Sequence, residues 1–311
     1  MKSLPIISLS ELARDVGNDK EIKKLYDTCD EHGFFYLKDH GVSKETLDRA
    51  IAASRKFFEL PESVKLQYHQ DNQKVYPKTS RGYSPLYGEV LNQNDGNDPK
   101  QMFDLGVEKP LSDEPFTGPN VLPDDSVAPD FARAHFQLQQ EILNKVVPKL
   151  IKGLALALDL DPHWFDKYFT DPVVIHRTIY YPPGVGGAGK HTDTGIFTVL
   201  IQEYFPHASL RVYTKNQWIE APPVEDAFVI NLGDMLQMWT NGLFVSTPHA
   251  VMHELPTTRV SIPLFVFPNI DTTIEPLGNP EAAIQSKDVM LKNFTSIWET
   301  KEGSGRAKEL V

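Results

Sequence analysis

Three short motifs in the second half of the chain contain residue types that could hold a metal ion and an organic acid. The first is His191-Thr192-Asp193, the second is the isolated His249, and the third is Arg259-Val260-Ser261. Two imidazoles and one carboxylate form the ligand set that binds Fe(II) on one face and leaves other coordination positions open for oxygen chemistry. The combination predicts a protein that activates O2 and uses an organic acid to do so.

The His-x-Asp spacing occurs twice in the sequence, so the surrounding residues must distinguish the two copies. The copy that begins at His69 lies in a polar run without an apolar face, which indicates a solvated loop. His191 follows the strand-like segment 173–181 and precedes the buried-strand pattern 196–201. Residues two apart in an extended segment point to the same side, so His191 and Asp193 can both face an interior cavity.

The Arg259 motif lies in an apolar, strand-like segment. Arg259 and Ser261 are two residues apart, so both side chains face the same side. A guanidinium offers paired donors to a carboxylate, and the serine hydroxyl adds a third. An inward arginine without a partner would incur a severe desolvation penalty, which favours a buried oxoacid carboxylate over a salt bridge at the strand edge.

The composition excludes several classes of protein and site. The 311 residues are 41% hydrophobic and 23% charged, as in ordinary globular proteins. The net charge of −11 argues against nucleic acid or an anionic membrane as a partner. Cys29 is the only cysteine, which excludes an internal disulfide and a thiolate metal site. Neither a secretory signal nor an apolar run of ~20 residues is present, so we expect a cytoplasmic protein.

We expect a single domain, 1–311, built from four consecutive parts. These are an N-terminal wrap with a pocket-covering segment, a backbone helix, a strand-rich core, and a C-terminal helix with its tail, over residues 1–125, 126–170, 171–270 and 271–311. The irregular stretch 70–125 is long enough to predict a covering or functional role at the mouth of the pocket. The apolar pattern over 129–158 predicts one long helix packed against a sheet.

Short strand patterns follow one another through the expected core. They cover 173–181, 197–202, 210–213, 218–220, 228–231, 250–252 and 260–267. We interpret 182–189, which is rich in proline and glycine, as a loop. Short strands at close spacing are typical of an antiparallel sandwich or barrel, so the predicted fold class is mainly β with additional helices.

The order and spacing of several segments resemble one enzyme family along most of the chain. The matching segments are 4–9 (LPIISL), 33–42 (GFFYLKDHGV), 180–183 (YYPP), 191–195 (HTDTG), 231–237 (NLGDMLQ), 240–242 (TNG), 246–251 (STPHAV) and 259–261 (RVS). Together they are similar to the Fe(II)- and 2-oxoglutarate-dependent dioxygenases of the isopenicillin N synthase-like group. The glycine-rich loop before His191 is more similar to microbial members of that group than to plant hormone or flavonoid enzymes.

The resemblance implies both a fold and a set of site residues. The fold is a double-stranded β-helix, or jelly roll, wrapped by N-terminal helices, a long backbone helix and a C-terminal helix. The implied iron ligands are His191, Asp193 and His249. Arg259 and Ser261 would bind the distal carboxylate of 2-oxoglutarate, and Tyr181 would be a further hydrogen-bond donor to it.

The implied activity is the oxidation of a small organic molecule by O2, with conversion of 2-oxoglutarate to succinate and CO2. Hydroxylation, desaturation and cyclisation are all compatible outcomes, and ascorbate is a candidate reductant. Two alternatives stay open: an oxidase on the same scaffold that does not use 2-oxoglutarate, and a non-catalytic jelly-roll binding protein. The sequence names neither the primary substrate nor the oligomeric state.

Further residues are candidates for substrate contact or for metal binding. Arg177 precedes Tyr181 by four residues on the strand that leads to the site, and it is a candidate for contact with the substrate or the oxoacid. His253 could share the inward face with His249, but as a ligand it would compete with it, so we expect a satisfied peripheral histidine. The candidates for substrate contact from the covering segment, where ordinary packing is the alternative, are Arg81, Tyr83 and Phe103.

Overall fold

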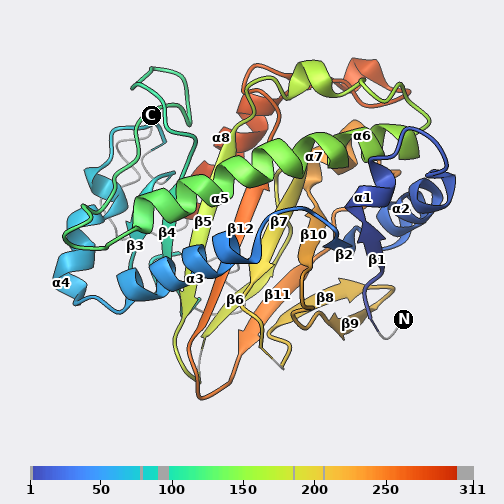
Figure 1. The fold of residues 1–311 in the computed structure, drawn as a ribbon. Coiled ribbons are helices and arrows are strands. Elements are labelled where there is room, and N and C mark those ends of the chain that lie inside the picture. Colours follow the sequence, from blue (N-terminus) through green and yellow to red (C-terminus); the bar gives the residue numbers. More distant parts are fainter. Residues whose placement is uncertain (1–2, 78–79, 90–97, 185, 206, 300–311) are drawn as a thin grey trace.

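The computed structural model describes residues 3–77, 80–89, 98–184, 186–205 and 207–299, which form a barrel of two β-sheets with helices on its outside (Figure 1). The larger sheet has the strand order β1-β2-β10-β7-β12-β5-β4-β3, and the smaller sheet has the order β6-β11-β8-β9. Residues 78–79 and 90–97 of the expected covering segment and 300–311 of the expected tail lie outside the described residues. No helix in the described part of the chain is long and apolar enough to cross a membrane.

The strands agree closely with the sequence pattern. Those of the larger sheet are β1 (Ile6–Ser8), β2 (Phe34–Lys38), β3 (Gly82–Ser84), β4 (Gln101–Leu105), β5 (Val174–Tyr181), β7 (Phe197–Gln202), β10 (Phe228–Leu232) and β12 (Arg259–Val266). Those of the smaller sheet are β6 (Gly186–His191), β8 (Leu210–Thr214), β9 (Gln217–Glu220) and β11 (His249–His253). A short hairpin, β13 (Thr273–Ile274) with β14 (Ile284–Gln285), follows the core. The jelly-roll fold, mainly β with α, is confirmed.

Strand β6 corrects the sequence prediction, because residues 186–189 were expected to belong to a loop. They pair instead with β11 in antiparallel register. The glycines that suggested a loop permit a close approach: a Cβ added to Gly186 would lie 2.6 Å from the Cβ of Tyr181. Tertiary pairing therefore overrides the weak strand propensity of glycine here.

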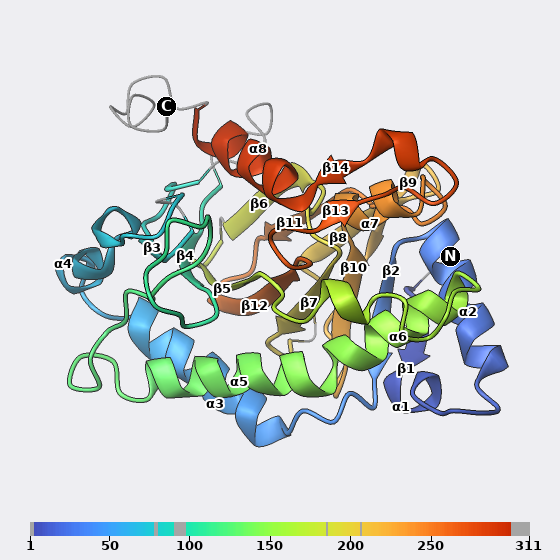
Figure 2. The same cartoon turned by 90° about the horizontal axis from the view of Figure 1, so that it is seen from above.

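The helices lie outside the sheets. They are α1 (Leu9–Leu12), α2 (Asp19–Glu31), α3 (Lys44–Phe58), α4 (Glu62–Lys65), α5 (Phe131–Lys145), α6 (Val147–Ala157), α7 (Asp234–Trp239) and α8 (Ser286–Glu299). In Figure 2, α3 and α5 run along one side of the sheets and α8 covers the opposite side. The expected N-terminal, backbone and C-terminal helices are therefore all present.

The backbone helix is divided, although the sequence pattern predicted one continuous helix. Helix α5 ends at Lys145 and α6 begins at Val147, with Pro148 in the first turn of α6. Proline has no backbone N–H to donate, and its ring clashes with the carbonyl group four residues earlier. It is tolerated in the first turn of a helix, so the boundary falls where the proline requires it.

The main hydrophobic core lies between this divided helix and the larger sheet. Leu138 and Ile142 of α5 and Leu150 and Leu154 of α6 are fully buried in one cluster with strand residues such as Val199. Burial on this scale, at roughly 25 cal/mol per Å² of apolar surface, fixes the sheet against the helices. The sheet therefore provides a rigid wall for side chains on its opposite, inner face.

Gly33 generates a testable prediction about this frame. It follows α2 with φ of +59°, and an added Cβ would lie 2.0 Å from the carbonyl oxygen of Val245. We expect Gly33→Ala to lower the free energy of unfolding by clearly more than the roughly 1–2 kcal/mol that left-handed backbone alone costs. Gly41→Ala is the matched control, since Gly41 has φ of +74° with nothing within 4 Å of an added Cβ. Urea denaturation of both variants measures the difference, and equal losses would contradict the steric argument.

Candidate active site

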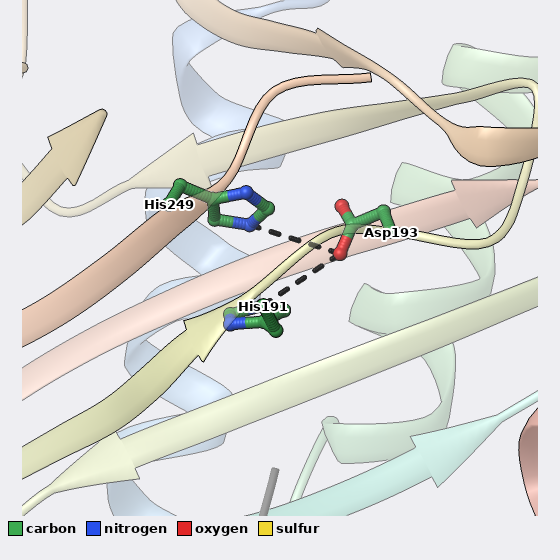
Figure 3. A group of neighbouring side chains, drawn as sticks. All are labelled: His191, Asp193 and His249. Carbon is green, nitrogen blue, oxygen red and sulfur yellow. Dashed lines mark ion pairs between the residues drawn. The ribbon is translucent and has the colours of Figure 1, made fainter. Parts of the chain in front are cut away.

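The three predicted metal ligands come together at one end of the barrel. His191 is the last residue of β6, Asp193 follows two residues later, and His249 is the first residue of β11. Because β6 pairs with β11 in a register that places His191 opposite His249, the two imidazoles are cross-strand neighbours. Figure 3 shows Asp193 facing both rings.

The distances within this triad suit a shared metal ion. The Nε2 atom of each histidine lies 3.7 Å from Oδ1 of Asp193. One ligand atom from each residue can be chosen so that all three lie within 4.8 Å of one another. Two imidazole nitrogens and one carboxylate oxygen directed at a common point are a donor set that fits Fe(II).

Hydrogen bonds to the backbone orient the two imidazoles. Nδ1 of His191 lies 2.7 Å from the carbonyl oxygen of Gly189, and Nδ1 of His249 lies 3.2 Å from that of Thr247. When Nδ1–H donates to a carbonyl, Nε2 carries the lone pair that a metal needs. Burial, and then the neighbouring His249, lower the pKa of His191 to about 3, so this imidazole is neutral at pH 7.

Asp193 is oriented by two polar residues that sequence reasoning missed. Its Oδ2 accepts hydrogen bonds from Thr198 Oγ1 at 2.5 Å and from Asn231 Nδ2 at 2.7 Å, which leaves Oδ1 directed at the imidazoles. Burial would raise the pKa of Asp193, but the two imidazoles and these hydrogen bonds together lower it, so it stays ionised. A signal was available, because Asn231 is a polar residue within the apolar strand β10.

The triad opens into a cavity between the two sheets. Strands of both sheets and helix α8 contribute to its lining. Most of the wall is apolar, with lining residues that include Phe34, Ile179, Leu210, Val251, Phe265 and Met290. A pocket of this kind, mainly apolar with a few convergent polar groups, suits a small organic ligand.

Arg259 provides the positive charge of this cavity. It is 4% exposed, and its Nη2 donates to Gln202 Oε1 at 2.9 Å. Its Nη1 lies 3.4 Å from Ser261 Oγ, and its Cζ lies 4.9 Å from the centre of the Tyr181 ring. Burial lowers the pKa of Arg259. Among the described residues no carboxylate lies within ion-pair distance of Arg259, so its buried charge fits an anionic ligand.

The four residues expected to contact substrate have different positions. Arg177 lines the cavity. Arg81, Tyr83 and Phe103 are buried beside the wall and do not belong to the lining. Arg81 donates to the carbonyl oxygens of Ser80 and Phe116, Tyr83 contacts Glu62 and Gln101, and Phe103 packs with Phe57 and Phe131. Of the four, only Arg177 is placed where a substrate could reach it, and its contact with substrate stays a prediction.

The remaining histidines that the sequence raised have other partners. His69 accepts a hydrogen bond from the backbone of Asp71 at a short 3-10 helix, Gln70–Asn72. Both ring nitrogens of His253 are engaged, with Ser209 and with the carbonyl group of Thr257. His253 is therefore the satisfied peripheral histidine that we expected.

Two family models match the chain in the expected order. The first is described as the non-haem dioxygenase in morphine synthesis N-terminal region and matches residues 4–125. The second is described as the 2OG-Fe(II) oxygenase superfamily and matches residues 172–268. The second model spans the strands that contain the triad and the arginine of the cavity.

Named relatives and solved structures agree with these models. The chain is 32% identical to a probable iron/ascorbate oxidoreductase of Dictyostelium discoideum, over 88% of this chain and 83% of that protein. It is also 32% identical to the 2-oxoglutarate-dependent dioxygenase traH of Penicillium crustosum, over 87% and 86%.

Two crystal structures share this fold. A putative 2OG-Fe(II) oxygenase family protein from Caulobacter crescentus has a TM-score of 0.81 and 26% identity, over 96% of this chain and 100% of that chain. A Neurospora crassa protein in complex with alpha-KG (2-oxoglutarate) and thymine has a TM-score of 0.79 and 26% identity, over 94% and 97%. The chain therefore belongs to the 2OG-Fe(II) oxygenase superfamily and is an Fe(II)- and 2-oxoglutarate-dependent dioxygenase that oxidises a small organic molecule.

Proposed function

We propose that this enzyme holds Fe(II) through His191, Asp193 and His249. A second group of residues, Arg259, Ser261 and Tyr181, would bind 2-oxoglutarate. One observation supports this assignment: the triad and Arg259 line the same buried cavity. The carboxylate of the triad has a lowered pKa, and Arg259 has no ion-pair partner among the described residues. A metal cation complements the triad, and a dianionic oxoacid complements Arg259.

Bound iron and 2-oxoglutarate supply the oxidising chemistry with O2, while succinate and CO2 are released. The protein's own groups position the reactants. The triad occupies one side of the metal position, Arg259 and Ser261 hold the distal carboxylate, and the apolar wall limits the access of water to the reacting centre.

The net charge of the chain indicates which class of partner the protein binds. A net charge of −11 supports a small-molecule substrate in preference to nucleic acid, because a nucleic-acid surface needs positive charge. The cytoplasmic location expected from the sequence stays a prediction. The same holds for ascorbate as reductant, for which the name of the Dictyostelium discoideum relative provides support.

The metal assignment predicts a graded loss of Fe(II) affinity. His191→Ala should remove most Fe(II) binding, because a ligand is lost. Asn231→Leu should weaken binding about 10- to 100-fold, since Asp193 loses a hydrogen bond that orients it. Anaerobic competition with a coloured chelator measures both affinities.

The second His-x-Asp pair provides the control for this experiment. His69→Ala removes a histidine with the same spacing to an aspartate, but at a 3-10 helix outside the cavity. Its Fe(II) affinity should equal that of the parent protein. Equal losses in His69→Ala and His191→Ala would show that the metal binds elsewhere.

The cosubstrate assignment predicts a selective loss in Arg259→Met. The dissociation constant of 2-oxoglutarate should rise about 100-fold, as expected when two charge-assisted hydrogen bonds of roughly 1.5 kcal/mol each are lost. Fe(II) affinity should not change. Anaerobic titration of the Fe(II) protein with 2-oxoglutarate, followed by visible absorption, gives the constant. Arg133→Met removes an arginine with a 64% exposed side chain and should leave the constant unchanged; an unchanged constant in Arg259→Met would refute the assignment.

A further inference from the structure

A cluster of buried acidic and basic side chains that pair with one another forms a second polar region of the cavity wall. Its members, here called the wall cluster, are Glu89, Asp98, Lys100, Asp104 and Arg177, and none is more than 9% exposed. Glu89, Lys100 and Arg177 line the cavity, and the two aspartates are buried next to them. Of these five residues, only Arg177 was a candidate from the sequence.

The cluster runs along one edge of strand β5. In the register of β4 with β5, Asp104 lies opposite Arg177 and Gln101 lies opposite Tyr180, so Lys100 lies beside the Tyr181 end of β5. Glu89 bridges the two cations: its carboxylate lies 3.0 Å from Arg177 Nη1 and 3.0 Å from Lys100 Nζ. The Lys100 end therefore lies close to the residues assigned to 2-oxoglutarate.

Asp98 connects the cluster to a metal ligand. Its Oδ1 accepts a hydrogen bond of 2.8 Å from the backbone N–H of Gly189, two residues before His191. Its Oδ2 lies 3.2 Å from Lys100 Nζ. The position of Lys100 is therefore fixed relative to the strand that ends in the triad.

The hydrogen-bonding capacity of the cluster is uneven. Both oxygens of Asp104 accept from Arg177 at 2.7 Å, and both oxygens of Glu89 accept from Arg177 at 3.0 and 3.1 Å. The carboxylate oxygens are thus engaged. An ammonium group has three N–H donors, and the carboxylates of Glu89 and Asp98 take two of those of Lys100. The wall cluster has donor capacity left, but each of its carboxylates already accepts from a cation.

The charge balance of the cluster differs from that of Arg259. Three carboxylates surround two cations, so the cluster has no positive charge to be neutralised. Burial would raise the pKa of Glu89, but Arg177 and Lys100 lower it to about 2, so the carboxylate is ionised. Burial likewise opposes the charged form of Lys100, yet Glu89 and Asp98 raise its pKa, so the ammonium persists.

We propose that Lys100 is a substrate-binding residue that donates a hydrogen bond to a neutral oxygen acceptor, such as the carbonyl group of a ketone, ester or amide. An anionic group would bring its charge beside cations that the carboxylates already neutralise. A cationic group would find carboxylates that are already paired. The apolar wall around the cluster would hold the carbon skeleton, so the substrate class is an apolar molecule with a neutral carbonyl. This proposal rests on the proposed function, because it concerns the part of the same cavity that 2-oxoglutarate leaves free.

The test compares three probes of similar size that differ in one group: acetophenone, benzoate and ethylbenzene. Each is titrated anaerobically into the protein with Fe(II) and saturating 2-oxoglutarate, and the change in the visible absorption band of that complex gives a dissociation constant. We expect the parent protein to bind acetophenone about tenfold more tightly than ethylbenzene, and more tightly than benzoate, as one hydrogen bond to a charged donor would produce.

In Lys100→Met the preference for acetophenone over ethylbenzene should disappear, while the affinity for 2-oxoglutarate stays within about twofold of the parent. The double variant Lys100→Met/Asp98→Asn keeps the net charge of the cluster, and an asparagine Oδ1 can still accept from Gly189. If Lys100→Met does not fold, this double variant takes its place and should show the same loss of preference for acetophenone over ethylbenzene. Lys109→Met removes a lysine that pairs with Asp171 outside the cavity lining and should retain the preference.

The outcomes distinguish a failure of the proposed function from a failure of the proposal for Lys100. If 2-oxoglutarate produces no absorption band with the parent Fe(II) protein, the proposed function fails. If the band forms but the parent binds benzoate best, or binds all three probes equally, the carbonyl proposal is overturned. It is also overturned if Lys100→Met retains the preference, or if that variant loses affinity for 2-oxoglutarate instead.

Discussion

Strand β6 pairs with strand β11 so that His191 stands directly opposite His249, and the active site depends on this register. A shift by one residue would turn the imidazoles to opposite faces of the sheet, because side chains alternate along a strand. Glycines in β6 permit the close approach, and Thr198 and Asn231 in the facing sheet fix the carboxylate of Asp193. The smaller sheet thus supplies the two histidines, and the larger sheet supplies the two residues that orient Asp193.

Two kinds of buried cation share the cavity, and their surroundings give them different roles. Arg259 has a glutamine, a serine and a tyrosine near it, but no ion-pair partner among the residues described. Arg177 and Lys100 are neutralised by carboxylates at 2.7 to 3.2 Å. A buried charge without a counter-ion is costly, so the site around Arg259 is completed by an anion, whereas the wall cluster is complete in charge without a ligand.

Local patterns in the sequence predicted the β-rich fold class, seven strands of the barrel and the pair His191 and Asp193, whereas His249 was assigned through the family resemblance. Apolar alternation is visible within a few residues, and the His-x-Asp spacing is two residues long. The strand β6 and the break at Pro148 were missed for a different reason. The glycines of β6 are held in a strand by β11, which lies about 60 residues later in the chain, and the apolar periodicity continues through the helix break.

Two cavity residues, Glu89 and Lys100, were missed for one physical reason. Glu89 and Lys100 come from the irregular segment 70–125, where no pattern indicates which way a side chain points. They belong to the cavity wall because Glu89 pairs with Arg177 of β5 and Lys100 pairs with Glu89. Arg81, Tyr83 and Phe103 come from the same segment and were chosen for their chemistry, yet the fold places them in the packing beside the wall. Residue type alone could not separate these two groups. What separates Lys100 from Phe103 is the alternation of side chains: Lys100, the residue before β4, lines the cavity, whereas Phe103, three residues later, faces the other way and packs against Phe57 and Phe131.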